Sequence, residues 1–485
     1  MAGGNWSLND QPVLPGLYMN FLSAAGNVIQ SGARGIVLAP VKAHWGPIGE
    51  VVEIAHEAAI ADVFGKDVTG GATAHTTLQL ALLGGPRKLL AYRLADDNAK
   101  QATLRLNKEG ENSDAILNIK AKYAGERGNG FSITIQDNEF TPEEKELKLI
   151  EGTTLLGTVN LGAGEVEQAV AAINDTLHKY IVAEKLAEGV LTNVAQAGLT
   201  GGNSGISGIT NADYIAATNV FETEEFHVLT LDGVGDEALR TSLIAWVKRV
   251  RKEGKGIMLT LGGSTAEDLA ETAVQKAIER SKVANHEGII NVGTGAKLNG
   301  VSYSSAQVAA WVAGLIAGQG LKESTTYAIS PFEDVTRRWT RAEQEQAVKQ
   351  GVFILIHDGL RVKVLRGINT LTSLAEGQGI SFKKIRKIRV LDQINSDLQR
   401  QAEDNYIGKV NNTEEGRLAL IEASRQYLQR LASENIIEST GYEVALDPRF
   451  YGNTKQFTPD ADQVYLTWRA DTTDVMEQIF GTFYV

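Results

Sequence analysis

The chain has 485 residues, a length that predicts about three domains of ordinary size. Its hydrophobic fraction of 43% and charged fraction of 22% are typical of a globular protein, and its net charge of −12 argues against nonspecific binding to nucleic acid or to an anionic membrane. Because the chain has no cysteine, disulfides, thiolate zinc sites and a cysteine nucleophile are excluded.

The first 22 residues are interpreted as an N-terminal arm. They lack the basic and apolar regions of a secretory signal. Pro12 and Pro15 oppose a helix, and an extended strand suits the apolar and aromatic residues that follow. These residues are Leu17, Tyr18, Met19 and Phe21. A terminal segment with few local partners is often disordered, and this alternative stays open.

Strands and helices alternate over residues 23–100, which we take as the first part of an α/β core. Strands are predicted from Gly35 onward and over Lys88 to Leu94. Helices are predicted over Ala58 to Phe64 and Thr76 to Leu83, and glycine follows each of them. Alternation of this kind favours a layered α/β fold.

The composition changes near residue 100. Between Ala102 and Val159 the chain offers short alternating segments separated by glycine, asparagine and aspartate turns, a pattern typical of a small β-sandwich or barrel. A helix is predicted over Glu165 to His178, and the glycine- and serine-rich run 199–208 indicates a flexible return to the core. We therefore predict an inserted β-rich domain over residues 101–202.

The second part of the core is predicted over residues 203–345, where strands and helices alternate again. The predicted helices are near Ala212 to Thr218, Glu237 to Lys252, Ala266 to Ala284 and Ser305 to Ala317, and the predicted strands are 226–233, 256–263 and 288–293. Apolar strands bounded by glycine, with crossover helices between them, indicate a largely parallel sheet. The apolar run from Ala306 to Gly318 is shorter than the ~20 residues of a membrane span, so we predict a buried helix and no membrane insertion.

A C-terminal α+β domain is predicted over residues 346–473. Asp358-Gly359 lies between two strand-like runs and is a strong hairpin signal. The apolar residues of this hairpin are Val352, Ile354, Ile356, Val362 and Val364. Phe382 to Leu391 alternates apolar with basic residues and is interpreted as a further strand, with a helix after it. Gln463 to Arg469 is a predicted core strand.

Residues 474–485 are interpreted as a C-terminal arm. Asp474 to Gln478 is predicted to be a turn or short helical segment, and the strand-like end carries bare apolar and aromatic residues. These are Ile479, Phe480, Phe483, Tyr484 and Val485. An exposed strand of this kind promotes aggregation unless a sheet receives it.

Three runs in the C-terminal region carry a resemblance to a known family. VLRGINTLTS (364–373), IRKIRVLDQINSDL (385–398) and YIGKVNNTEEGR (406–417) resemble the C-terminal half of contractile tail sheath proteins. These proteins come from phages and phage-tail-like bacteriocins, particularly of Gram-positive hosts, and the order of elements matches over the whole chain. The runs are not chemical motifs, so they indicate a lineage and no active site.

The resemblance implies an architecture and an assembly. It implies a subtilisin-like α/β core, with the inserted β-domain on the outer surface, and no enzyme activity or cofactor. It implies hexameric rings stacked helically around an inner tube, in a metastable form that shortens and drives the tube through a target cell envelope. The tail tube, baseplate and tail terminator proteins are the implied partners, in a virion tail or phage-tail-like particle assembled in the bacterial cytoplasm.

The resemblance also assigns roles to the chain ends and to a basic cluster. Both arms are expected to join a sheet shared between neighbouring subunits, with the 352–366 hairpin as the candidate receiver. The C-terminal region is expected to face the tube, so its basic residues are a candidate tube contact. These residues are Lys383, Lys384, Arg386, Lys387 and Arg389. The alternative is a solvated strand face whose charges protect an edge.

A soluble α/β enzyme with an inserted β-domain is the competing interpretation. The chain has histidines and serines, the raw ingredients of a catalytic triad, but none lies in a Gly-x-Ser-x-Gly setting. These residues are His227, His286, His357, Ser264 and Ser304. The acids Asp232 and Asp236 suit a helix cap, and the run 293–300 suits a turn better than a phosphate site. Nothing in the sequence favours catalysis.

Overall fold

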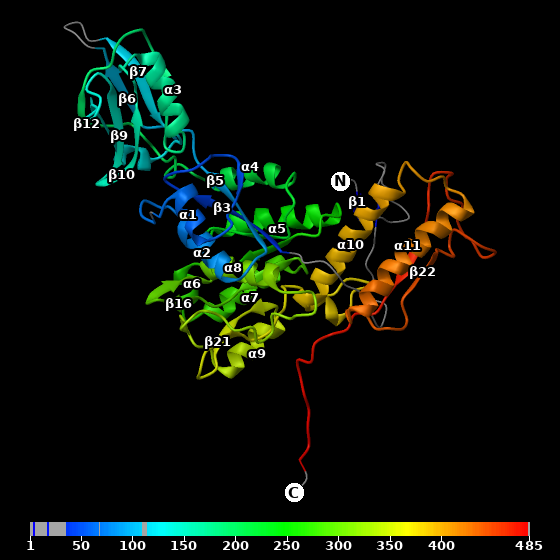
Figure 1. The fold of residues 1–485 in the computed structure, drawn as a ribbon. Helices are drawn as coiled ribbons and strands as arrows, with labels where there is room; N and C mark the ends of the chain where they lie inside the picture. The colour runs from blue at the N-terminus through cyan, green and yellow to red at the C-terminus, as the bar shows by residue number, and fades with distance from the viewer. Residues whose placement is uncertain (1–2, 5–16, 19–34, 67, 109–113, 484–485) are drawn as a thin grey trace. The chain divides into compact units, whose positions relative to one another are not determined.

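The computed structural model describes residues 3–4, 17–18, 35–66, 68–108 and 114–483 (Figure 1). Its elements form a mixed α/β fold with several sheets, which confirms the predicted class in its coarse form. No helix among the described residues is long and apolar enough to cross a membrane.

The largest sheet has seven strands in the order β19-β15-β14-β13-β3-β5-β4. Five of them pair in parallel: β3 (Ile36–Lys42), β13 (Val228–Thr230), β14 (Met258–Leu261), β15 (Ile289–Val292) and β19 (Val352–Phe353). At the other side, β4 (Val51–Glu53) runs antiparallel to β5 (Lys88–Leu94). Every residue of β13, β14 and β15 is buried, so both faces of the sheet are covered, as the predicted parallel sheet requires.

Crossover helices provide this cover. The predicted buried helix is α8 (Ser305–Gly318), which packs on β13, β14 and β15 and is apolar on all sides. Ser304 caps it: its hydroxyl accepts a hydrogen bond from the Gln307 N–H, and the Gln307 side chain accepts one from the Ser304 N–H. Helices α5 (Glu237–Lys252) and α7 (Ala273–Ala284) pack on β14 and β15 respectively.

The helix predicted over Ala266 to Ala284 is instead two helices. The first, α6 (Thr265–Leu269), ends where Ala270 adopts an extended backbone, and α7 starts at Ala273. The Ala270 carbonyl accepts a hydrogen bond from Arg337 Nη1 at 3.3 Å, a long-range contact that local periodicity does not show. The remaining helices of the α/β core are α1 (Glu57–Phe64), α2 (Ala74–Leu83), α4 (Asn211–Phe221) and α9 (Arg341–Lys349).

Contacts between residues divide the chain into two compact units. One unit takes residues 40–79 and 90–220, and the other takes the rest. The smaller unit contains two sheets, β10-β9-β8-β12 and β11-β7-β6, and helix α3 (Val166–Thr176). Its strands are β6 (Thr103–Asn107), β7 (Ala115–Ala121), β8 (Phe131–Asp137), β9 (Lys145–Glu151), β10 (Thr154–Asn160), β11 (Ile181–Lys185) and β12 (Val194–Gly198), with the short helix η1 (Glu126–Gly130).

The core of this unit draws on a residue outside the predicted insert. Trp45 is 1% exposed and packs edge-on against Phe131, with 5.4 Å between ring centroids. Arg127 lies over the Trp45 ring at 5.3 Å and forms an ion pair with Glu151 at 2.7 Å. The strands predicted within residues 101–202 are present, but their core also includes Trp45. The borders of the inserted domain stay a prediction.

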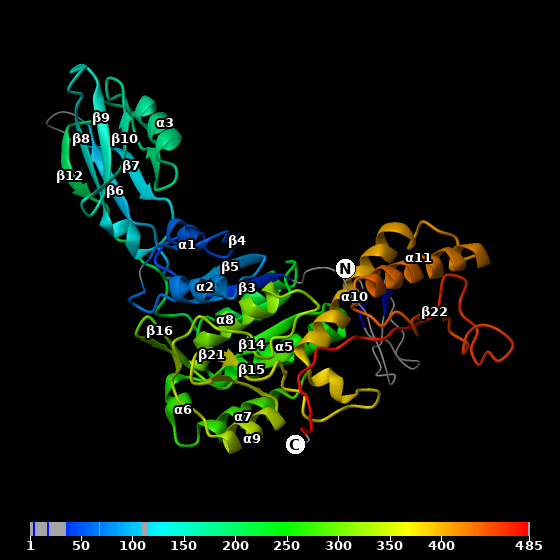
Figure 2. The ribbon, with the colours of Figure 1, turned by 60° about the horizontal axis from the view of Figure 1, so that its bottom comes forward.

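The C-terminal region is built on two long helices. Helices α10 (Ile385–Asn405) and α11 (Glu414–Ser433) lie side by side, as Figures 1 and 2 show. They share an apolar cluster with the two-stranded antiparallel sheet of β22 (Glu443–Leu446) and β23 (Leu466–Arg469). The short helix η2 (Ile380–Lys383) precedes α10.

The strand predicted over Phe382 to Leu391 is wrong, because this segment is η2 and the start of α10. Its apolar residues alternate only over a short window. Ile385, Ile388, Leu391, Ile394 and Leu398 recur at spacings of three and four residues, which is a helical period.

Small sheets complete the structure. The predicted hairpin is present as β20 (Leu355–His357) and β21 (Val362–Val364), while the start of its first run is β19 in the large sheet. Asp358 shapes the turn by accepting hydrogen bonds from the N–H groups of Leu360 and Arg361. The run predicted to turn at 293–300 contains β16 (Ala296–Leu298), which pairs with β17 (Val301–Tyr303) and β18 (Asp334–Val335).

Candidate subunit-linking site

The C-terminal arm is an extended segment with exposed apolar side chains. Residues 474–483 form no helix or strand, so the helical segment considered for Asp474 to Gln478 is absent (Figure 1). Ile479, Phe480 and Phe483 are 84%, 89% and 89% exposed. Large apolar side chains are rarely this exposed unless another surface receives them. Tyr484 and Val485 lie outside the described residues.

Only part of the N-terminal arm can be placed. Leu17–Tyr18 form β2, which pairs in parallel with β1 (Gly3–Gly4) and lies beside α10. Met19 and Phe21 lie outside the described residues. The role of this segment in linking subunits stays a prediction.

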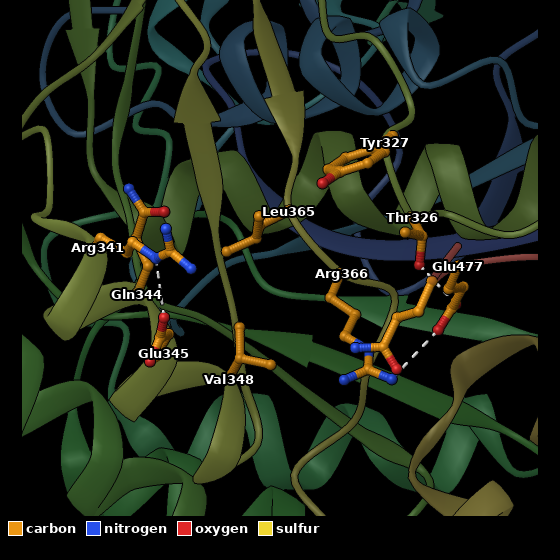
Figure 3. Close-up of a pocket in the computed structure, with 10 residues that line it drawn as sticks. Thr326, Tyr327, Arg341, Gln344, Glu345, Val348, Leu365, Arg366 and Glu477 are labelled. Atoms are coloured by element: carbon orange, nitrogen blue, oxygen red, sulfur yellow. Dashed lines mark hydrogen bonds and ion pairs between the residues drawn. The ribbon is translucent and has the colours of Figure 1, made fainter. Parts of the chain in front are cut away.

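Within the C-terminal arm, the side chain of Glu477 is only 7% exposed. One carboxylate oxygen of Glu477 accepts a hydrogen bond from Thr326 Oγ1 at 2.8 Å. The other lies 3.1 Å from Lys384 Nζ and 3.4 Å from Arg366 Nη2. Figure 3 shows the Thr326 and Arg366 side chains pointing toward this carboxylate. Sequence reasoning did not find Glu477, Arg366 or Thr326, although the acids at 471, 474 and 477 complement the basic run at 383–389.

The basic residues proposed to contact the tube bind segments of their own chain. Arg386 and Arg389 are 6% and 2% exposed. Arg386 donates to the Leu321 carbonyl at 3.0 Å and to the Thr473 carbonyl, and Arg389 donates to the carbonyls of Gln319 and Gly320. These two guanidinium groups therefore hold the segments 319–321 and 472–474 against α10.

The three lysines of the cluster are also engaged. Lys384 pairs with Asp474 at 2.6 Å, Lys387 Nζ donates to Thr472 Oγ1 at 2.9 Å, and Lys383 Nζ donates to the Thr372 carbonyl at 3.2 Å. Burial lowers the pKa of Lys387 to about 8. The tube contact stays a prediction, and the structure adds an intramolecular role for the same side chains.

A cavity of about 370 Å³ opens beside the root of the arm (Figure 3). Val348, Leu365 and the exposed ring of Tyr327 give it apolar walls, and Arg366 and Glu477 give it charged ones. The arm therefore leaves the subunit next to a partly apolar hollow.

The predicted receiving hairpin has one edge already in use. The N–H groups of Tyr327 and Ser330 donate to the carbonyls of Val364 and Val362, and the Val364 N–H donates to the Ala328 carbonyl. Val352, Ile354, Val362 and Val364 are buried and Ile356 is partly buried. Among the described residues, β22 and β23 form a sheet of two strands, so each of them is an edge strand.

The histidines and serines considered for catalysis have structural roles. Nδ1 of His227, His286 and His357 accepts a hydrogen bond from a backbone N–H, of Ile36, Gly288 and Gly359 respectively. Ser264 and Ser304 cap α6 and α8. The predicted cap by Asp236 is confirmed, since its carboxylate accepts from the Leu239 N–H at 2.8 Å. No group of three or more metal-ligating side chains occurs in the part of the chain that the structure describes.

Comparison with known proteins identifies the family. Residues 207–370 match the model of the phage tail sheath protein central domain, and residues 378–485 match that of the phage tail sheath C-terminal domain. The chain belongs to the phage tail sheath family. The recognition made from the three C-terminal runs is therefore confirmed, and the enzyme alternative is not favoured.

Solved sheath structures share the fold over most of the chain. The sheath tail protein of Desulfitobacterium hafniense is 29% identical, with a TM-score of 0.68 over 89% of this chain and 94% of that chain. The sheath tail protein of Listeria innocua is 26% identical, with a TM-score of 0.68 over 86% of this chain and 90% of that chain. A tail sheath protein of Clostridium phage phiCD119 is 28% identical over 228 residues, which are 47% of this chain and 58% of the relative.

Proposed function

We propose that this tail sheath subunit forms hexameric rings that stack helically around an inner tube and later shorten to drive the tube through a target cell envelope. Family membership supports the sheath, and the exposed C-terminal arm supports linkage between its subunits. The work of contraction comes from the free-energy difference between two packings of the same subunit, so no nucleotide site is required. A baseplate, a tail terminator and the tube are the partners, in the tail of a phage or phage-tail-like particle.

The single observation that carries this proposal is the exposure of Ile479, Phe480 and Phe483 at the end of an extended segment. From Gln478 to the C-terminus the arm has eight residues, which reach about 26 Å at ~3.3 Å per residue. This length is sufficient to enter a neighbouring subunit and add a strand to a sheet edge there. The β22–β23 sheet offers two such edges. We propose it as a second candidate receiver, in addition to the 352–366 hairpin.

Three finer assignments belong to the same proposal. The β-rich insert lies on the outside of the sheath, and the C-terminal region faces the tube. The α/β core is subtilisin-like, an assignment supported by the parallel order β19-β15-β14-β13-β3. A tube contact by the basic cluster uses Lys383 or the partly exposed faces of Lys384 and Lys387, because Arg386 and Arg389 are buried.

Deletion of residues 479–485 tests the linking role of the arm. Residues 479–483 form no helix or strand and their large side chains are exposed, so the truncated chain is expected to stay folded and soluble and to form no sheath cylinders. Deletion of residues 1–22 is expected to do the same.

Circular dichroism, sedimentation and electron microscopy measure these outcomes. Full-length protein that forms hollow cylinders is the positive control. Cylinders of normal length from either truncated chain contradict linkage through the arms, whereas an unfolded product shows that the segment folds back on its own subunit. If the full-length chain forms only compact discrete particles, the sheath assignment itself fails.

A further inference from the structure

The described part of the C-terminal arm, residues 474–483, divides into a tethered part and a free part, and one carboxylate lies at the boundary. Upstream, the Thr473 N–H donates to the Ile436 carbonyl at 3.2 Å and the Glu438 N–H donates to the Asp471 carbonyl at 3.0 Å. These backbone bonds hold the chain as far as Thr473. Beyond them, Asp474 and Glu477 hold the segment to the folded body through ion pairs, and Glu477 also accepts hydrogen bonds from the hydroxyls of Thr326 and Ser324.

The two acids hold the chain unequally. The Asp474 side chain is 44% exposed, so water and salt screen its ion pair with Lys384. The Glu477 side chain is 7% exposed and meets two hydroxyls, of Thr326 and Ser324, and two cations. A buried carboxylate needs partners of this kind, because an unpaired buried charge carries a large desolvation cost.

We propose that Glu477 is an anchor that fixes the point at which the C-terminal arm leaves the subunit and so limits the reach of the arm. With the anchor closed, the free segment is residues 478–485, about 26 Å long at ~3.3 Å per residue. With the anchor open, the free segment begins at Val475 and has eleven residues, so its reach rises to about 36 Å. This inference rests on the proposed linking role of the arm and gives it a defined length.

The partners of Glu477 determine where tension on the arm enters the fold. Lys384 directly precedes α10, and Arg366 follows β21 by two residues. Thr326 belongs to the segment that borders the other edge of β21. A pull from a neighbouring subunit therefore reaches the helical C-terminal region and the hairpin together, at a single carboxylate.

A label at position 476 tests the anchor in the monomer. The chain has no cysteine, so Met476→Cys gives a unique site for a spin label, and the Met476 side chain is 88% exposed and makes no buried contact that labelling would remove. Glu477→Gln removes the charge and keeps the shape, and Glu477→Ala removes both. The matched control is Glu345→Gln, which alters an acid of the same cavity whose pair with Arg341 is exposed and does not touch the arm.

The anchored label is expected to be restricted in the otherwise unchanged protein and in Glu345→Gln, and to become mobile in both Glu477 variants. A second label at Thr482→Cys, in the free segment, should be mobile in every variant. Unchanged mobility at 476 in both Glu477 variants overturns the anchor.

Assembly assays separate this inference from the proposed function. If the arm links subunits, Glu477→Gln cylinders form with altered subunit spacing or shortened length, while Glu345→Gln cylinders are normal. Restricted mobility at 476 together with full-length chains that never assemble contradicts the sheath function and leaves the anchor intact. Mobile labels together with normal Glu477→Ala cylinders show that the anchor exists and does not limit linkage, which refutes its proposed role in reach.

Discussion

Replacing Asp392 by asparagine tests how helix α10 is held to helix α5. Asp392 Oδ1 and Oδ2 each lie 2.9 Å from a terminal nitrogen of Arg251, in a two-pronged ion pair between the two helices. The side chains are 8% and 11% exposed. Arg251 Nη1 also donates to the Ile257 carbonyl at 2.8 Å, so the guanidinium stays in place when the carboxylate is changed.

The expected cost follows from this geometry. An exposed ion pair contributes about 0–1 kcal/mol, whereas removing one partner of a buried pair costs about 3–5 kcal/mol, because the other charge is left without compensation. Glu287 lies 3.7 Å from Arg251 Nε and supplies part of that compensation. Asparagine also keeps one acceptor oxygen. We therefore expect Asp392→Asn to lower the free energy of unfolding by about 3 kcal/mol, the lower end of that range.

Urea unfolding of the full-length chain, followed by circular dichroism, measures this loss. The control is Glu422→Gln on α11, which removes an ion pair with Arg425 at 3.2 Å whose side chains are 54% and 51% exposed. Its cost is expected to be below about 0.5 kcal/mol. A loss smaller than 1 kcal/mol for Asp392→Asn would show that the pair does not hold the two helices together, and would refute the reasoning.

Two further predictions concern the core and the insert. Burial raises the pKa of Asp268 to about 6, so its contribution to stability falls as the pH rises from about 4 to 6, by up to about 3 kcal/mol. Asp268→Asn should remove this dependence of the free energy of unfolding on pH, measured by urea titrations across that range. An unchanged dependence in the variant contradicts the prediction. Deleting residues 101–202 with a short Gly/Ser join exposes Trp45, so the deletion is combined with Trp45→Ser. The product should still form cylinders, and an insoluble or only monomeric product contradicts the predicted boundary.

Local sequence signals were sufficient where contacts are local. Helix α5 has the predicted bounds Glu237–Lys252, because Asp236 caps it and its apolar period is regular. The parallel strands were recognisable because glycines bound short, wholly apolar runs. The segment 382–391 was misassigned because alternation and helical period agree over so short a window. Lys384 of this segment pairs with Asp474 and Glu477, which lie about 90 residues further along the chain. No local sequence pattern shows that pairing.

A linking role for the chain ends could be proposed from the sequence only through the resemblance. Composition shows that residues 479–483 are apolar, and only the structure shows that they lie exposed and unsupported. The anchor at Glu477 depends on partners from three separate segments, around residues 324–326, 366 and 384, so no local pattern in the sequence indicates it. Tertiary pairing also decides which sheet edges are open to an incoming strand. Residues 327–330 already pair with one edge of the 352–366 hairpin, and the sequence did not show this.

The two-stranded sheet of β22 and β23 has a thermodynamic consequence. A pair of strands is marginally stable unless other elements support it, and this pair relies on α11. An arm that adds a third strand from another chain completes the folding of this region only after association. By mass action, the apparent melting temperature of this region should then rise with protein concentration, whereas that of the seven-stranded sheet should not. Under the proposed linkage, the subunit finishes folding as it joins the growing polymer, and a chain that has not been incorporated is the easier target for proteolysis.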